Sequence, residues 1–403
     1  MARRVLILHS SAGRYGADLQ LLAIAGGLDR ARWQPLCVLP ERGELGALLE
    51  QAGVEVVVHP LAVLRRRLLT PSGTARLVHA AAADRRAIGA IARDRNVALV
   101  HSNTSVILSG GPIARAAGVR HLLHVREIYE GAAGRMSAAL WPAFRGGMLR
   151  AGALACISAA VAAQFTGSPK AFVLYDGLPR SPAPMARAAA RDLLGVPADR
   201  FVVALIGRVS DWKGQDVLAR ALAEPALASI GAVGLVAGDT APGAADEANR
   251  LDRLAGALGV GDRLLRLGFR QDVEVVLGAA NALAVPSKRP EPLGLVALEG
   301  AAAGLPVVAS AHGGVTEIVK DHESGRLVPP RDPRALSAAL RALAEDPASA
   351  AAMGEAGRKD VAERFGLARM LDELQDAYDR LAASRPARDL TPPTPTRPPR
   401  STR

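Results

Sequence analysis

Two glutamates interrupt a stretch of small and apolar residues, and their placement suggests a ligand site. The stretch reads EPLGLVALEGAAAGLPVV from position 291, and Glu291 and Glu299 are its two charged residues. A buried glutamate is rare unless it has a partner. The partner is either another residue, such as a core arginine, or a ligand, and the spacing alone leaves both open.

A short helix over this stretch would place the two carboxylates on either side of its N-terminus. Pro292 precedes the expected helix, Gly294 lies in its first turn, and the helix ends near Ala303. A helix N-terminus binds phosphate through its free N–H groups and its dipole. Since carboxylates accept hydrogen bonds from sugar hydroxyls, the layout fits the sugar, diphosphate and ribose of a nucleoside-diphosphate sugar.

Two cations occupy a loop that follows another expected strand of the same half. The strand covers 202–207, and Arg208 and Lys213 follow it in the segment GRVSDWKGQD. Charge-assisted hydrogen bonds to a diphosphate would contribute about 1.5–3 kcal/mol each. Two solvated surface cations are the alternative, and the spacing does not decide between them.

Polar residues also follow three strands that we expect in the first half of the chain. The three groups are His9-Ser10-Ser11, His101-Ser102-Asn103, and His124 with Arg126 and Glu127. In open α/β sheets, ligands bind beyond the carboxyl ends of the strands, so we expect the groups to meet at one crevice, with His124 as the leading functional histidine. Gly16, in the first loop, belongs to a turn that presents backbone N–H groups to an anion.

Several common catalytic signatures do not occur. The sequence has no H-x-H, H-E-x-x-H or D-x-D pattern, so we expect no metal site. The turn at 10–17 lacks G-x-G-x-x-G, and no P-loop pattern is present, which argues against a dinucleotide fold or a P-loop enzyme. Cys37 and Cys156 lie in apolar runs and are expected to be reduced core thiols.

Short apolar runs alternate with segments of helical length along the chain. The expected strands lie at 4–8, 34–39, 54–58, 98–102, 121–125, 153–158 and 171–175, and then at 202–207, 232–238, 264–268, 282–287, 306–310 and 325–329. Runs with so few charges are typical of strands buried on both faces of a parallel sheet. The pattern restarts after a Pro/Ser/Ala-rich stretch at 178–186, which predicts two doubly wound α/β domains with a cleft between them.

The positive charge is concentrated in one half of the 403-residue chain. The net charge is +11, with 22 basic and 11 acidic residues in 1–183 and 28 of each in 184–403. No basic stripe is interleaved with aromatics, so we expect no nucleic-acid partner. The first apolar run is too short for a signal peptide and no apolar run reaches about 18 residues, which predicts a cytoplasmic protein without a membrane span.

The second half resembles the retaining glycosyltransferase family 4. The matching segments, in order and spacing, are GRVSDWKG, GFRQDVEVVLGAANALAVPS, EPLGLVALEGAAAGLPVVAS, GGVTEIV and GRLVPPRD. The E-x7-E pattern of Glu291 and Glu299 is the most specific of them, and the resemblance extends over 3–383. It implies the GT-B fold of two Rossmann-like domains facing a cleft, and metal-independent, retaining transfer of a sugar from a nucleoside-diphosphate sugar, with no further cofactor.

The resemblance implies roles for the charged motif residues. Glu291 would contact the donor sugar near the reacting carbon, and Glu299 would hold the ribose hydroxyls. Arg208 and Lys213 would neutralise the diphosphate and stabilise it as it leaves.

The same resemblance implies roles for the remaining candidates. The backbone of Gly294 and Leu295 would face the sugar and phosphates. Gly16 would sit over the donor phosphates and the acceptor, and His124 would stand at the reaction centre. Two departures concern the acceptor side: the first loop reads RYGA where the family often has a Gly-Gly pair, and Asp-Gly at 176–177 replaces the usual Asn-Gly.

These arguments divide the chain into four parts. We expect an acceptor-side domain at 1–183, a donor-binding domain at 184–364, a helix at 365–383 that crosses back to the first domain, and a Pro/Arg-rich disordered tail at 384–403. The tail should be removable without loss of activity. Two other functions stay open, namely a nucleotide-sugar epimerase of the same fold and a transferase acting on a small soluble acceptor.

The acceptor prediction depends on an arginine-flanked apolar segment at 134–152. Leu140, Trp141, Phe144 and Met148 recur there at near-helical spacing, which is typical of a helix lying on an anionic membrane or of an ordinary core-facing helix. Many family members act on lipid-linked acceptors. The resemblance therefore implies a lipid-linked or polysaccharide-precursor acceptor and peripheral contact with the inner face of the membrane.

Overall fold

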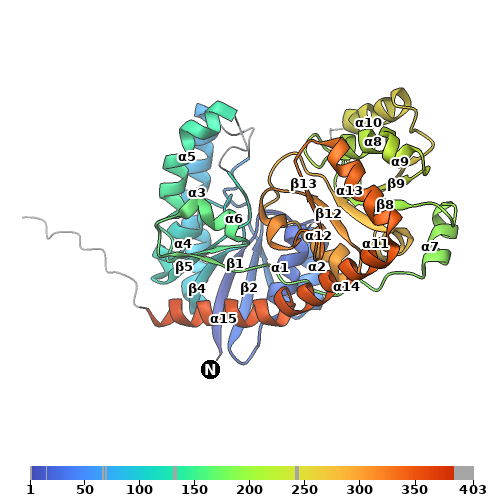
Figure 1. Cartoon of the computed structure of the whole chain (residues 1–403). Coiled ribbons are helices and arrows are strands. Elements are labelled where there is room, and N and C mark those ends of the chain that lie inside the picture. The colour runs from blue at the N-terminus through green and yellow to red at the C-terminus, as the bar shows by residue number, and fades with distance from the viewer. Residues whose placement is uncertain are drawn as a thin grey trace, which may run out of the picture.

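The computed structural model contains two parallel sheets, each covered by helices (Figure 1). It describes residues 2–384 except 15, 66, 67, 69, 130–133 and 241–244. The tail expected at 384–403 lies outside the described residues, apart from Ser384.

The first sheet is built from the first half of the chain in the order β3-β2-β1-β4-β5-β6-β7, with every neighbouring pair parallel. Its strands are β1 (Arg3–Leu8), β2 (Trp33–Leu39), β3 (Glu55–Val58), β4 (Val97–Ser102), β5 (Arg120–Val125), β6 (Ala153–Cys156) and β7 (Ala171–Val173). The accompanying helices are α1 (Gly16–Gly27), α2 (Glu44–Gln51), α3 (Pro71–Asp94), α4 (Gly110–Ala117), α5 (Gly134–Met148) and α6 (Ala159–Ala162), with the 3-10 turn η2 (Ala163–Phe165).

The second sheet has the order β10-β9-β8-β11-β12-β13 and is also parallel throughout. Its strands are β8 (Val202–Ile206), β9 (Val233–Ala237), β10 (Leu264–Gly268), β11 (Ala282–Val285), β12 (Val307–Ser310) and β13 (Gly325–Val328). The accompanying helices are α7 (Arg187–Leu194), α8 (Gln215–Ala223), α9 (Pro225–Ala228), α10 (Ala245–Ala257), α11 (Val273–Ala279), α12 (Leu295–Ala302), α13 (Pro333–Glu345) and α14 (Pro347–Arg364), with the 3-10 turn η3 (Gly314–Glu317). The last helix of the described chain is α15 (Leu367–Ala383).

The apolar runs became strands because helices on both faces of each sheet bury them. All residues of β6, β9, β11 and β12 are buried, as expected for strands inside doubly covered parallel sheets. Strand order reverses between β1 and β4 in one sheet and between β8 and β11 in the other. Such reversals place ligand sites at the carboxyl ends of the central strands, so a ligand is expected at the loops after β1 and β8.

Helix α15 returns to the first sheet after the second is complete, and Figure 1 shows it running along that sheet. Its Leu374 and Tyr378 belong to the core that β1 and β2 form. Tyr378 shares a hydrogen bond with His101 Nδ1 at 2.7 Å, and Trp33 Nε1 donates to Asp379 at 2.9 Å. The helix thus ties the two ends of the described chain together.

Helix α5 buries the aromatic face that the sequence suggested for a membrane. Trp141 stacks on Tyr129 with ring centroids 5.6 Å apart, and Phe144 packs edge-on against the same ring at 5.1 Å. Met148 is buried, whereas 49% of Leu140 is exposed. The periodicity therefore marks mainly a core-facing helix, because the domain itself covers three of the four apolar residues. Among the described residues, no helix is long and apolar enough to cross a membrane.

Candidate active site

Helix α12 begins at a glycine that no other residue replaces without strain. Gly294 is its N-cap, with φ of +99°, which lies in the left-handed region. The sequence had suggested Gly294 within the first turn, but its positive φ keeps it just outside the helix. Because Gly294 carries no capping side chain, the first N–H groups of α12 are left for an anion.

The buried carboxylate of Glu291 has a cation and a hydroxyl as partners. Its Oε1 accepts from Lys213 Nζ at 2.8 Å and from Ser287 Oγ at 2.5 Å, and 4% of the residue is exposed. The Glu291 carbonyl oxygen also accepts from Gly314 N–H at 2.7 Å, which fixes the segment before α12. The sequence left open whether the partner of Glu291 is a residue or a ligand, and in the structure Lys213 is a partner.

Lys213 reaches Glu291 because its loop packs tightly on the segment after β11. At Gly214, with φ of +82°, a Cβ would lie 2.0 Å from the carbonyl oxygen of Pro286. The Trp212 carbonyl accepts from Lys288 N–H at 2.7 Å. The Lys213 ammonium lies 4.3 Å from the centroid of the Trp212 ring, a cation–π contact that adds to its ion pair.

Arg208 stands at the start of the same loop. Its side chain is exposed, and its carbonyl oxygen accepts from Gln215 Nε2 at 3.0 Å. The loop therefore carries one partly buried cation and one exposed cation on the side of the second domain where α12 begins.

Glu299 lies further along α12 in a different environment. Burial raises the pKa of its carboxyl to about 7, and the negative charge of Glu274 adds to the shift. No described residue forms a hydrogen bond or an ion pair with this side chain. A half-buried carboxylate without a protein partner is suited to accept hydrogen bonds from a ligand.

The first domain brings a glycine and a polar network to this region. A Cβ built at Gly16 would lie 3.3 Å from Leu295 Cδ1, so the start of α1 faces the start of α12. In the network, His9 Nδ1 pairs with Asn103 Nδ2 at 3.1 Å, and Arg126 Nε donates to the Asn103 carbonyl at 2.9 Å. The three polar groups therefore contact one another, as predicted, in a buried network, and their opening to a crevice stays a prediction.

Arg126 is the centre of that network. It donates through Nη1 to both oxygens of Asp176, at 2.7 and 2.6 Å, and both side chains are almost fully buried. His9 in turn bonds Asp18 at 2.8 Å. Sequence reasoning did not connect Arg126 with Asp176, although Asp176 was noted as a departure from the family pattern.

His124 is placed behind Arg126 instead of at an open surface. It is fully buried, its Nδ1 lies 3.5 Å from Arg126 Nη2, and its ring stacks on His101. Burial and the neighbouring charges of Arg126 and His101 hold the pKa of His124 well below its usual range. Its role at the reaction centre stays a prediction, and its nearest charged neighbour is the buried Arg126.

The residues that the structure describes contain no group of three or more His, Cys, Asp or Glu side chains placed to hold a metal ion. Lys213 and Arg208 are the two cations that the loop after β8 carries, and Lys213 is paired with Glu291.

The second half of the chain is similar to known glycosyltransferases. Residues 187–360 match the family described as Glycosyl transferases group 1. D-inositol 3-phosphate glycosyltransferase from Saccharomonospora viridis is 42% identical over 202 residues, 48% of this chain and 46% of that protein. Its counterpart from Salinispora arenicola is 38% identical over 206 residues, 49% and 45% of the two chains. The chain thus spans about half the length of the curated relatives that it matches.

Solved structures extend the likeness to both domains. Anabaena HepE in complex with UDP gives a TM-score of 0.79 at 26% identity, covering 94% of this chain and 100% of that one. HepE in complex with UDP-glucose gives 0.78 at 26% identity, with the same coverage. Sucrose-phosphate synthase from Thermosynechococcus elongatus, at 24% identity and a TM-score of 0.74 over 95% and 100% of the chains, shares the fold.

Two parallel-sheet domains with these neighbours define the GT-B class, which confirms the predicted fold. The chain as a whole thus has the GT-B fold, and within it residues 187–360 are similar to group 1 of the glycosyl transferases.

Proposed function

We propose that this chain transfers a sugar from a nucleoside-diphosphate sugar to an acceptor hydroxyl, with retention of configuration and without a metal ion. The observation that carries the proposal is the buried Glu291–Lys213 pair beside the uncapped N-terminus of α12. HepE, which resembles the chain over nearly its whole length, was solved with UDP and with UDP-glucose. That supports a uridine nucleotide as the donor.

The donor diphosphate lies at the start of α12 in this proposal. The helix N–H groups, Lys213 and Arg208 stabilise the charge that grows on the diphosphate as it leaves. Removing one preorganised contact of this kind typically lowers the rate by about 10²–10³-fold. Glu299 accepts hydrogen bonds from the ribose hydroxyls, which accounts for a carboxylate with no partner among the described residues.

Transfer breaks the bond between the anomeric carbon and a phosphate oxygen, which keeps the bonding electron pair. The acceptor oxygen forms the new bond on the same face, and its proton passes to the departing diphosphate. Glu291, held in place by hydrogen bonds from Lys213 and Ser287, orients the sugar and stabilises positive charge at its anomeric carbon. His124 contributes to the reaction centre through Arg126.

For the acceptor we propose a lipid-linked or polysaccharide-precursor glycan, taken up by a cytoplasmic enzyme in peripheral contact with the inner face of the membrane. The support is the excess of basic residues in 1–183. A small soluble acceptor is the second candidate. It is favoured by the names of the two relatives that match about half of this chain, because both names contain inositol 3-phosphate. A small anionic acceptor of this kind also suits the basic first domain.

A thermal-shift screen of UDP-, GDP- and ADP-sugars tests the donor, since a ligand at 100 times its dissociation constant adds about 2.7 kcal/mol of stability. Proton NMR of the product then gives its anomeric configuration, with and without EDTA. An inverted product, or activity that EDTA abolishes, contradicts the mechanism. Stoichiometric conversion of the donor to another sugar nucleotide without acceptor would instead identify the epimerase alternative.

A further inference from the structure

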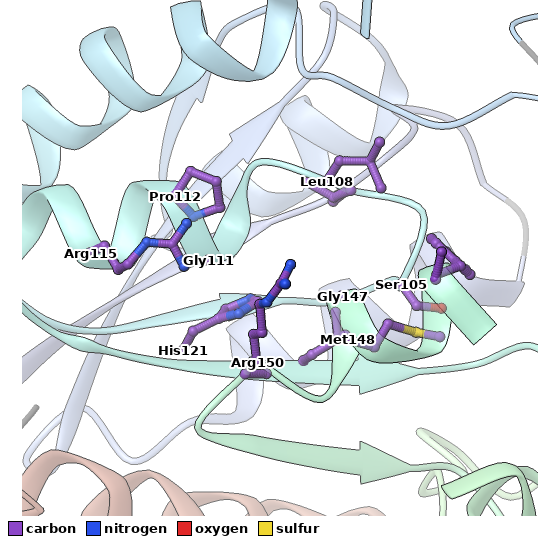
Figure 2. Close-up of a pocket in the computed structure, with 14 residues that line it drawn as sticks. Ser105, Leu108, Gly111, Pro112, Arg115, His121, Gly147, Met148 and Arg150 are labelled. Atoms are coloured by element: carbon purple, nitrogen blue, oxygen red, sulfur yellow. The ribbon is translucent and has the colours of Figure 1, made fainter. Parts of the chain in front are cut away.

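The first domain contains a pocket that the proposed transfer reaction does not use. It has a volume of about 270 Å³ and lies between α4, α5 and β5 (Figure 2). None of the donor-side residues Glu291, Lys213 or Glu299 lines it.

One side of the pocket is cationic. Arg115 and Arg150 are both exposed there, and neither guanidinium forms a hydrogen bond or an ion pair with a described residue. Figure 2 shows both on the same side as His121. Burial and the charge of Arg115 lower the pKa of His121 to about 4, and its Nε2 shares a 2.9 Å hydrogen bond with Ser102, so His121 is neutral at pH 7. Two positive charges therefore face the pocket without an acceptor.

The other side of the pocket is apolar. Leu108, Phe144 and Met148 line it together with the buried Ile107 and Leu123. A pocket with two cations at one side and a hydrocarbon wall at the other matches a ligand that has an anionic head and an apolar body. An inorganic phosphate or a sugar phosphate would leave the apolar wall without a partner.

Between residues 139 and 148 of α5, the exposed residues are uncharged. Leu140, Ala143, Gly146 and Gly147 are exposed there, and Ala143 and Gly147 also line the pocket. Uncharged residues flanked by unpaired arginines suit the boundary between lipid headgroups and acyl chains. Arg145, by contrast, turns inward and donates to the Gln164 carbonyl at 2.7 Å.

We propose that this pocket binds one anionic phospholipid, with the phosphate between Arg115 and Arg150 and the first part of an acyl chain against Leu108, Phe144 and Met148. The site is separate from the donor site and gives the first domain a defined point of attachment to an anionic membrane. This proposal rests on the proposed membrane contact and refines it, because a single lipid is held in a pocket formed by α4 and α5. The buried aromatic face of α5 does not have to insert into the membrane.

Vesicle flotation of the full chain, with phosphatidylglycerol in phosphatidylcholine against phosphatidylcholine alone, tests the site. One variant, Arg115→Ala with Arg150→Ala, removes both cations, and Arg85→Ala with Arg86→Ala removes two exposed charges of α3 as its control. A second variant, Gly147→Leu, fills the pocket, and Gly146→Leu is its neighbour outside the lining. A Cβ at either glycine meets no atom within 4 Å, so both leucines are tolerated by the helix.

Wild-type protein should float with the anionic vesicles. Loss of the two pocket arginines should lower the partition coefficient about thirtyfold, the equivalent of about 1 kcal/mol per charge, while the α3 pair changes it by less than about threefold. Gly147→Leu should lower it about tenfold, and Gly146→Leu should not. Equal losses from both arginine pairs, wild-type binding by Gly147→Leu, or no flotation of the wild type would each overturn the proposal.

A second arm separates a membrane lipid from a soluble phosphate. Monomeric dihexanoyl phosphatidylglycerol should protect the protein in a thermal-shift assay, and glycerol phosphate at the same concentration should not. Protection by both would contradict the lipid assignment. UDP-glucose binding, measured on the same variants, should stay unchanged, so failure of the lipid site is distinguishable from failure of the donor site.

Discussion

Replacement of Lys213 should separate the stability of the donor site from its chemistry. Lys213→Ala leaves the buried Glu291 carboxylate with the Ser287 hydroxyl as its remaining side-chain partner among the described residues. Breaking a fully buried pair costs about 3–5 kcal/mol, and a charged hydrogen bond contributes about 1.5–3 kcal/mol. Because 24% of the Lys213 side chain is exposed, we expect a loss of about 2 kcal/mol in the free energy of unfolding.

The same change should lower kcat with UDP-glucose by about a hundredfold or more, since it removes a preorganised cation from the diphosphate. Adding Glu291→Gln to Lys213→Ala removes the unpaired charge. The double variant should therefore regain about 1–2 kcal/mol relative to the sum of the two single losses, while its activity stays low.

Urea unfolding followed by fluorescence gives the stabilities, and initial rates of sugar transfer give kcat. Lys213→Met is a useful companion, because it keeps the aliphatic stem without the charge. Additive stability losses in the double variant would show that the 2.8 Å pair has no energetic weight. Wild-type kcat in Lys213→Ala would show that the diphosphate does not lie beside this cation.

Three further predictions follow from single residues. Burial raises the pKa of Glu299 to about 7, so the contribution of this residue to the free energy of unfolding is present below about pH 4.5 and is lost as pH rises through 7. The affinity for UDP-glucose should rise over the same pH range. Calorimetry from pH 5.5 to 8.5 should show both trends, and Glu299→Gln should flatten them. Arg126→Met leaves Asp176 buried and unpaired, so urea unfolding should report a loss of about 3 kcal/mol or more, and an unchanged midpoint would contradict the pairing. Gly214→Ala forces a Cβ against the Pro286 carbonyl oxygen and should lower both the melting temperature and kcat. A normal melting temperature with a normal kcat would show that the loop does not pack against Pro286.

The fold could be predicted from the sequence because buried parallel strands consist of short runs of apolar residues. Every expected strand from 4–8 to 325–329 corresponds to a strand of the structure, and no end differs by more than two residues. The polar groups after β1, β4 and β5 could also be predicted to meet, since all three strands end at the same edge of one sheet.

The partners of the site residues could not be predicted. Lys213 and Glu291 are 78 positions apart, and Arg126 and Asp176 are 50 apart, so their pairing depends on how loops of different strands pack. The periodicity of α5 shows an apolar face but does not say whether lipid or protein covers it. In the structure Tyr129 covers much of it, and this residue comes from a different segment.

A crystal structure of the chain with UDP-glucose tests the central claim most directly. We predict the diphosphate within hydrogen-bond distance of the N–H groups at the start of α12 and of Lys213, with the ribose at Glu299 and the glucose at Glu291. UDP-glucose bound with its diphosphate away from α12, or with Glu299 turned from the ribose, would contradict the assignment of this site as the donor site.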